Sequence, residues 1–145
     1  MPSAAQDTRA LLAKTLLALG SETKSAEQTA DLAMQIWLGM AGALSPIVGQ
    51  RGVAALYKRS LQLACGEFVW LVSVRDEVDH VPEFTGLRAA LAQQTSPVAA
   101  EANLALLVTF HDLLTSLIGR SLTDRLLQSV WDQLSSGDAA QDTSP

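Results

Sequence analysis

Residues Val98–Trp131 read VAAEANLALLVTFHDLLTSLIGRSLTDRLLQSVW, and this stretch holds the densest apolar patches of the chain. Leu104–Val108 and Leu113–Ile118 supply the patches, and Gly119 divides the stretch into two parts. Apolar residues recur at three- and four-residue steps on both sides of the glycine, which is the period of an amphipathic helix. The stretch therefore predicts two helices hinged at Gly119, around which the rest of the chain packs.

The same periodicity extends along the rest of the chain. Apolar residues recur at helical spacing between glycines and prolines, and no useful length alternates with the period of two that a strand needs. We therefore predict an all-α fold, a bundle of five to six helices in one domain over residues 6–135, with disordered tails at 1–5 and 136–145. The expected helices cover residues 6–19, 25–48, 52–75, 86–94, 96–118 and 121–135, with a loop at 76–84.

Start and stop signals set several of these boundaries. Residues Ser25 to Gln28 (SAEQ) have the form of a capping box, in which the serine side chain accepts from the third amide and the glutamine reaches back. Ser96-Pro97 is typical of an N-cap followed by proline at the first helical position. Pro46, near the end of the helix over 25–48, predicts a kink around Ala43–Ser45.

An internal similarity relates two of the expected helix junctions. Leu44–Gly49 followed by Leu56-Tyr57 aligns with Leu114–Gly119 followed by Leu126-Leu127, at a constant offset of 70 residues. Two αα-hairpins packed with pseudo-twofold symmetry explain this alignment. The alternative is that helix–Gly–helix junctions look alike in any bundle, because glycine is the commonest C-terminal cap.

Charge and cysteine content limit the function classes. Ten Lys and Arg against fifteen Asp and Glu give a net charge of −5, and the basic residues are scattered, so the basic stripe of a nucleic-acid-binding protein is not expected. Cys65 is the single cysteine and has no internal disulfide partner, which favours a reducing compartment. No targeting motif is apparent, and we expect a cytoplasmic protein.

The stretch from Val98 to Ile118 is the candidate for a membrane span. Polar residues such as Asn103, His111 and Asp112 interrupt it, and these groups are costly in lipid. We therefore expect no membrane span, and interpret this stretch as a helix buried in the protein.

His111 is the residue with the clearest chemical potential. A histidine on a bundle helix is where a histidine phosphotransfer domain places its phosphoacceptor, which needs an exposed imidazole and a nearby cation. Asp112 adjoins His111 and no lysine lies within a helical turn, so a partly buried ring bonded to Thr115 or to a carbonyl is the alternative.

No other constellation indicates chemistry. Metal ligands at helical spacing around His111 are missing, since Leu107, Val108, Leu114 and Thr115 occupy those positions. Serine-nucleophile and phosphate-binding motifs are also missing, and Cys65 reads as an inert thiol. We expect no enzyme, no metal and no cofactor, with haem or a small apolar ligand in the bundle interior as an alternative.

Large apolar residues instead suggest a surface for a partner. Tryptophan and tyrosine are favoured interface anchors, although in a helical domain they are more often core residues. The run from Phe68 to Val74 offers more apolar area than one packing face uses, which indicates a protein partner or a homodimer. The residues predicted to contact it are Tyr57, Phe68, Trp70, Leu71 and Val74.

Two runs carry a family resemblance. Leu44–Leu61, with PIVG and AALYKRSL, and Phe110–Trp131, with LLTSLIG and LTDRLL, resemble small helical bacterial proteins of unassigned function that occur alongside signalling kinases and cyclases. The resemblance implies a signalling context and a kinase or cyclase as partner. It carries no functional residue across.

These observations favour a non-catalytic adaptor or regulatory module of bacterial signal transduction. The alternatives are a phosphotransfer protein using His111 and a sensor with a ligand or haem in its interior.

Overall fold

The computed structural model describes residues 25–79 and 83–143, and for residues 133–143 it describes the backbone only. Within these residues the chain is all-α, as predicted, without a strand. The elements are α2 (Ala26–Ala64), the 3-10 helix η1 (Val69–Leu71), α3 (Val72–Glu77), α4 (Thr85–Ala92), α5 (Ser96–Ile118) and α6 (Arg120–Thr143). The helix predicted over residues 6–19 lies outside the described part of the chain.

Helix α2 begins at the capping box predicted from the sequence. The Ser25 amide donates to Gln28 Oε1 over 2.9 Å, and the Gln28 amide donates to Ser25 Oγ over 3.2 Å. Two of the amides that a helix N-terminus leaves without partners are thereby satisfied. Four consecutive residues, Ser25 to Gln28, therefore determine where the helix starts.

A glycine divides α2 into two arms. Gly49 has φ 80° and ψ 162°, an extended left-handed conformation that is open almost only to glycine. The kink predicted around Ala43–Ser45 thus falls a turn later. Pro46 stays inside the helix, where it removes one backbone donor, but the chain changes direction only where a glycine permits it.

A second glycine joins α5 to α6 in almost the same way. Gly119 has φ 89° and ψ 156°, and α6 begins at the next residue, Arg120. The N-cap of α5 is Thr95, whose hydroxyl accepts from the Val98 amide over 3.4 Å, one residue earlier than the predicted Ser96. We call the backbone turns at Gly49 and Gly119 the two elbows.

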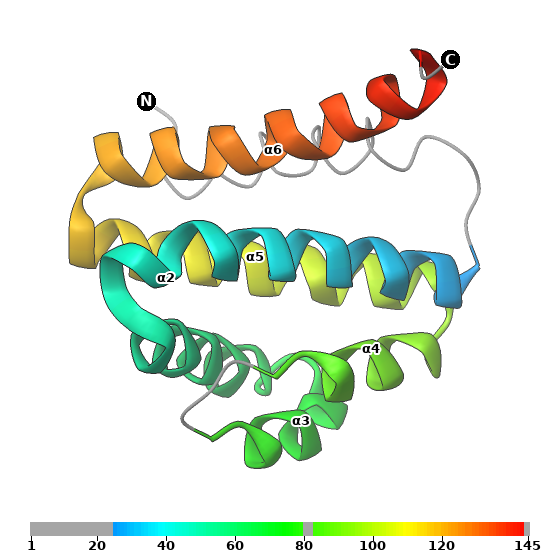
Figure 1. Cartoon of the computed structure of the whole chain (residues 1–145). Helices are drawn as coiled ribbons and strands as arrows, with labels where there is room; N and C mark the ends of the chain where they lie inside the picture. The colour runs from blue at the N-terminus through cyan, green and yellow to red at the C-terminus, as the bar shows by residue number, and fades with distance from the viewer. Residues whose placement is uncertain (1–24, 80–82, 144–145) are drawn as a thin grey trace, which may run out of the picture.

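The first arm of α2 and helix α5 lie side by side and run in the same direction. Thr29 Oγ1 lies 3.4 Å from Ser96 Oγ near the two N-termini, and Trp37 Nε1 donates to Asn103 Oδ1 over 3.0 Å further along. Because residues 26–48 and 96–118 are equally long, both elbows lie at the same end of the molecule, on the left of Figure 1.

The remaining helices cover this central pair from two sides. Figure 1 shows α6 along one side, and the second arm of α2 with α3 and α4 along the other. The approach of α6 is close at Gly39, where a Cβ atom would lie 3.1 Å from Val130 Cγ1. The absence of a side chain at Gly39 therefore allows α6 to pack closely against α2.

The predicted helix over 52–75 ends early. Helix α2 stops at Ala64, the amides of Glu67 and Phe68 both donate to the Ala64 carbonyl, and the chain passes through η1 into α3. Phe68 has φ −120° and ψ 84°, which is not helical. The apolar residues after position 67 therefore line a bend, and they do not form one helix that is apolar on all sides.

The C-terminal part also differs from expectation. Helix α6 starts at Arg120 and not at Ser121, and the Thr123 hydroxyl in its first turn donates to the Gly119 carbonyl over 2.8 Å. The backbone stays helical to Thr143, through residues expected to be disordered.

The expectation of no membrane span is corrected. By length and composition, two helices of the described residues, Ala26–Ala64 and Ser96–Ile118, could cross a membrane. The polar groups that argued against a span find partners within the protein, as Asn103 does with Trp37. Partnered polar groups cost less in an apolar medium than free ones, so their presence does not exclude a membrane.

The elbows yield a stability prediction. Gly49→Ala and Gly119→Ala are each expected to lower the free energy of unfolding by about 1–3 kcal/mol, because alanine disfavours this backbone conformation. Apart from the adjacent backbone, no atom lies within 4 Å of a Cβ added at either position, so the cost is that of the backbone conformation alone.

Gly42→Ala is the matched control. Gly42 is helical, also has open space around it, and its replacement should stabilise α2 by about 0.5–1 kcal/mol. Chemical denaturation of the three variants measures these differences. Equal effects at positions 42, 49 and 119 would contradict the assigned elbow geometry.

Candidate functional site

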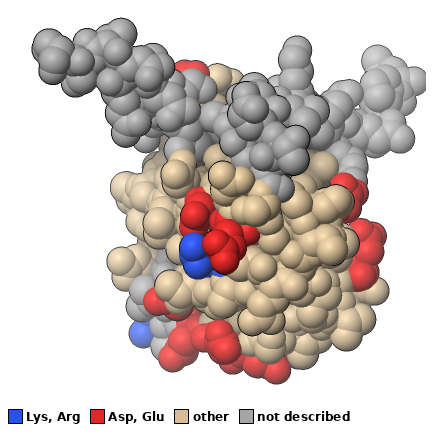
Figure 2. Space-filling model, turned by 90° about the vertical axis from the view of Figure 1, so that its right-hand side faces the viewer, with Lys and Arg blue, Asp and Glu red and all other residues tan. Residues whose placement is uncertain are grey.

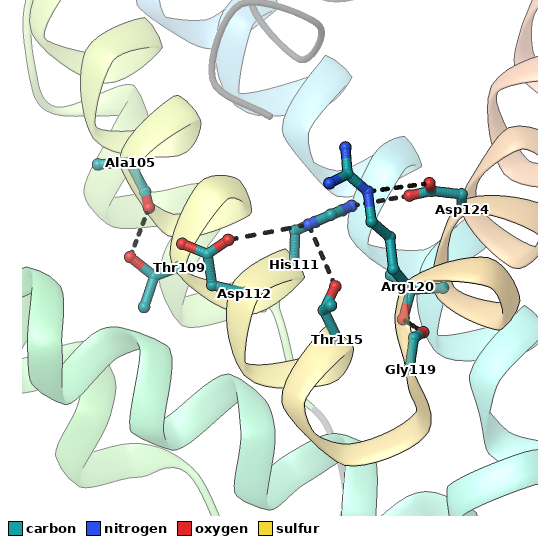
Figure 3. Close-up of polar contacts among 9 residues, drawn as sticks. Ala105, Thr109, His111, Asp112, Thr115, Gly119, Arg120 and Asp124 are labelled. Atoms are coloured by element: carbon teal, nitrogen blue, oxygen red, sulfur yellow. Dashed lines mark hydrogen bonds and ion pairs between the residues drawn. The ribbon is translucent and has the colours of Figure 1, made fainter. Parts of the chain in front are cut away.

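A polar cluster surrounds His111 where α5 meets α6 (Figure 3). His111 Nε2 lies 3.3 Å from Asp124 Oδ1, and Nδ1 lies 3.5 Å from Thr115 Oγ1. Arg120 Nε lies 3.6 Å from Asp124 Oδ2. The elbow at Gly119 creates this cluster, because it folds the first turns of α6 back against the last turns of α5.

Both ring nitrogens face polar groups of the protein. A carboxylate only accepts hydrogen bonds, so His111 Nε2 carries the hydrogen that faces Asp124, while Nδ1 faces the Thr115 hydroxyl and has Asp112 Oδ1 4.0 Å away. The imidazole side chain is 11% exposed, whereas that of Asp124 is 52% exposed. His111 therefore ties α5 to α6 beneath a solvated ion pair.

This arrangement does not favour phosphoryl transfer. A phosphoacceptor nitrogen needs a free lone pair and access for a dianionic donor, but Nε2 faces a carboxylate and Nδ1 faces a hydroxyl. Sequence reasoning missed Arg120, a cation next to the ring in space. Arg120 is paired with the same Asp124 carboxylate, and its charge is already partly neutralised.

Most residues predicted to contact a partner lie in the core. Tyr57 and Leu71 are fully buried, Val74 and Phe68 are nearly so, and Trp70 is half-buried against Phe68 with ring centroids 6.0 Å apart. The prediction of a partner surface at these residues is corrected. The bend after Ala64 turns Phe68, Leu71 and Val74 inward, which helical periodicity could not anticipate.

Aromatic side chains fill the interior expected to hold a ligand. The rings of Trp37, Tyr57, Phe84 and Phe110 pack against one another with centroid separations of 4.8–5.8 Å. Trp37 stands at the centre, edge-on to Phe110 and hydrogen-bonded to Asn103. The interior around Trp37 and Phe110 is thus filled by side chains of the protein itself.

Two nucleophilic groups are held in unreactive states. Burial raises the pKa of the Tyr57 hydroxyl well above its usual range, and the carboxylates of Glu83 and Glu77 raise it further. Burial also raises the pKa of the Cys65 thiol, and Arg75 offsets this in part. Both groups stay protonated near neutral pH, in which state neither is an effective nucleophile.

The described residues contain no group of three or more His, Cys, Asp or Glu side chains that could hold a metal ion. His80, within the loop predicted over residues 76–84, lies outside the described part of the chain.

Exposed apolar residues give a second candidate site. Ile47 is 49% exposed and Leu117 is 61% exposed, and each lies two residues before an elbow glycine. Leu38, Leu63, Val69 and Val98 are further exposed apolar residues elsewhere on the surface. A signal for these positions existed in the sequence, because Ile47 and Leu117 occupy matching positions when Leu44–Gly49 is aligned with Leu114–Gly119, and both fall outside the buried stripe of their helices.

Comparison of the chain with protein-family models, curated proteins and solved structures finds no match.

The His111 cluster leads to a labelling prediction. Incubation with phosphoramidate at neutral pH should give the wild type no more acid-labile phosphate than the His111→Ala variant, because both ring nitrogens are engaged within the protein. Phosphate label is measured by filter binding before and after acid treatment. Labelling of the wild type that disappears in His111→Ala would restore the phosphotransfer hypothesis.

Proposed function

We propose that this protein is a non-catalytic interaction module that acts through exposed apolar side chains. The observation that carries the proposal is the pair Ile47 and Leu117, which stay about half exposed at one end of the molecule. The most chemically capable side chain, His111, is by contrast engaged by its own chain.

Energetics support a role for these residues in binding. Full burial of an Ile or Leu side chain contributes about 1.5–3 kcal/mol, so covering the exposed half of each contributes roughly 1 kcal/mol. A single exposed apolar side chain is ordinary, but two at corresponding places beside two similar turns form a pattern.

The matching positions of Ile47 and Leu117 also bear on the architecture of the protein. We propose that residues 25–61 and 95–131 are two related αα-hairpins within a helical bundle, offset by 70 residues. The near-identical torsion angles at Gly49 and Gly119 support this, and so does the burial pattern. The pairs in which both residues are buried are Ala33/Asn103, Ile36/Leu106, Trp37/Leu107, Met40/Phe110, Leu44/Leu114, Val53/Thr123, Tyr57/Leu127, Ser60/Val130 and Leu61/Trp131.

On this proposal Ile47 and Leu117 are equivalent residues of the two hairpins. Two related elbows then present two related apolar side chains at one end of the protein. A regulatory or adaptor role in bacterial signalling, as the family resemblance implies, and a cytoplasmic location stay predictions.

Site-specific photo-cross-linking in cells tests the proposed function. Benzoylphenylalanine placed at Ile47 or Leu117 should give a discrete cross-linked product with protein or lipid, because a binding partner covers these side chains. The matched controls are Ala55 and Ser129, which are exposed but lie along the second arms of the hairpins. His111→Ala should leave the cross-linking unchanged.

Absence of a product at Ile47 and Leu117, together with absence at the other exposed apolar positions Leu38, Leu63, Val69 and Val98, would refute an apolar interaction surface.

A further inference from the structure

The end of the molecule that holds both elbows has a distinct composition. We call residues 45–52 and 115–121 the elbow tip. Ile47 and Leu117 protrude there, and Val48 and Ile118 lie half-buried behind them. The other exposed side chains of the tip are small or neutral, apart from two arginines described next.

Those arginines are Arg51 and Arg120, one just beyond each elbow. The tip contains no acidic residue, and the only charged residues between Leu32 and Gly66 are Arg51, Lys58 and Arg59, all basic. On the other hairpin the nearest carboxylates are Asp112 and Asp124, and Asp124 is paired with Arg120 and His111. The elbow tip itself therefore carries two arginines and no carboxylate, although Asp124 shares the charge of Arg120 and the whole chain has a net charge of −5.

The opposite end has the reverse character. Helix α2 begins there with Glu27 and Asp31, and Asp31 accepts from Arg88 Nε over 2.7 Å. Figure 2 looks onto this end and shows several acidic groups with few basic ones. Charge is thus separated along the direction of the central helices, with the basic charge and the protruding apolar residues at the elbow tip.

We propose that the elbow tip binds the surface of an anionic phospholipid bilayer, an inference that rests on the proposed function. Protruding Ile47 and Leu117 side chains match the apolar boundary beneath the headgroups, while Arg51 and Arg120 match the lipid phosphates. This combination of an apolar knob and a basic rim is complementary to an anionic membrane.

The size of the tip favours lipid over a protein partner. A stable protein interface covers about 800 Å² on each partner, which needs a broad continuous patch. The tip instead offers two protruding side chains, Ile47 and Leu117, at the ends of two helices. Single apolar side chains of this kind can insert between lipid headgroups. The carbonyl groups at the C-terminal ends of residues 26–48 and 96–118 need water or other donors, which holds the tip at headgroup depth.

Vesicle flotation of the full chain tests this inference. The wild type should float with phosphatidylcholine vesicles that contain 30 mol% phosphatidylglycerol, should float less at high salt, and should not float with phosphatidylcholine alone. Ile47→Asp combined with Leu117→Asp should lower the bound fraction about tenfold, because it removes the apolar contact and adds repulsion. Arg51→Gln with Arg120→Gln should remove the preference for the anionic vesicles.

Leu63→Asp is the matched control, since Leu63 is 48% exposed and lies at the far end of the second arm of α2. It should float like the wild type, and thermal unfolding of each variant checks that the fold is kept. Wild-type protein that stays at the bottom with anionic vesicles would overturn the inference. So would flotation that the tip variants leave unchanged.

The two proposals fail separately. Cross-linking of Ile47 or Leu117 to a protein, without flotation, would leave the interaction module standing and reject lipid as its partner. A dimer in light scattering that Ile47→Asp and Leu117→Asp dissociate, again without flotation, would assign a second copy to the tip. If the protein shows no cross-linking and no flotation, both proposals are rejected.

Discussion

Two glycines in an extended left-handed conformation are the constraint on which the rest of the structure depends. At Gly49 and Gly119 the chain leaves one helix and enters the next without an intervening loop. A side chain at either position opposes this turn through backbone strain, since no neighbouring atom fills the space. The elbows therefore decide which helices lie side by side, and they bring Asp124 to His111.

The central pair of helices depends in turn on a buried hydrogen bond. Trp37 Nε1 and Asn103 Oδ1 satisfy each other between two apolar surfaces, and an unpaired group there costs about 1–3 kcal/mol. Sliding one helix along the other breaks this bond and separates the ring of Trp37 from that of Phe110. Packing of the rings and pairing of the polar groups thus select the same register.

Local signals in the sequence predicted much of this fold. The helical class, the capping box at Ser25 and the stop at Gly119 follow from residues that are close in sequence, and each is confirmed. The end of α2 at Ala64 was missed because the residues that follow, from Phe68 to Val74, have apolar spacing that suits a helix and a bend equally well. Only packing against the rest of the protein decides between the two.

At the candidate site, too, contacts within one helix were predictable and contacts between helices were not. His111 was identified from the sequence, and Thr115 or a carbonyl was predicted as its partner; the structure places the Thr115 hydroxyl beside it, four residues along the same helix. Asp124 and Arg120 come to the ring across the elbow, and no local pattern encodes that contact. The partner surface predicted around Trp70 failed for a related reason. Large apolar residues occur both in cores and at interfaces, and only their exposure, which the sequence does not give, separates the two.

The most direct test of this account is the direction of the two central helices in solution. Nitroxide labels at Gln50→Cys and Ser121→Cys, in a Cys65→Ala background, place one label beside each elbow, and a second pair combines Glu27→Cys with Ser121→Cys. A helix of 23 residues is about 35 Å long. Double electron–electron resonance should therefore find a label-to-label distance in the second pair that is longer than in the first by roughly 20 Å or more. A second pair as close as the first, or closer, would show that the elbows lie at opposite ends and would contradict the account.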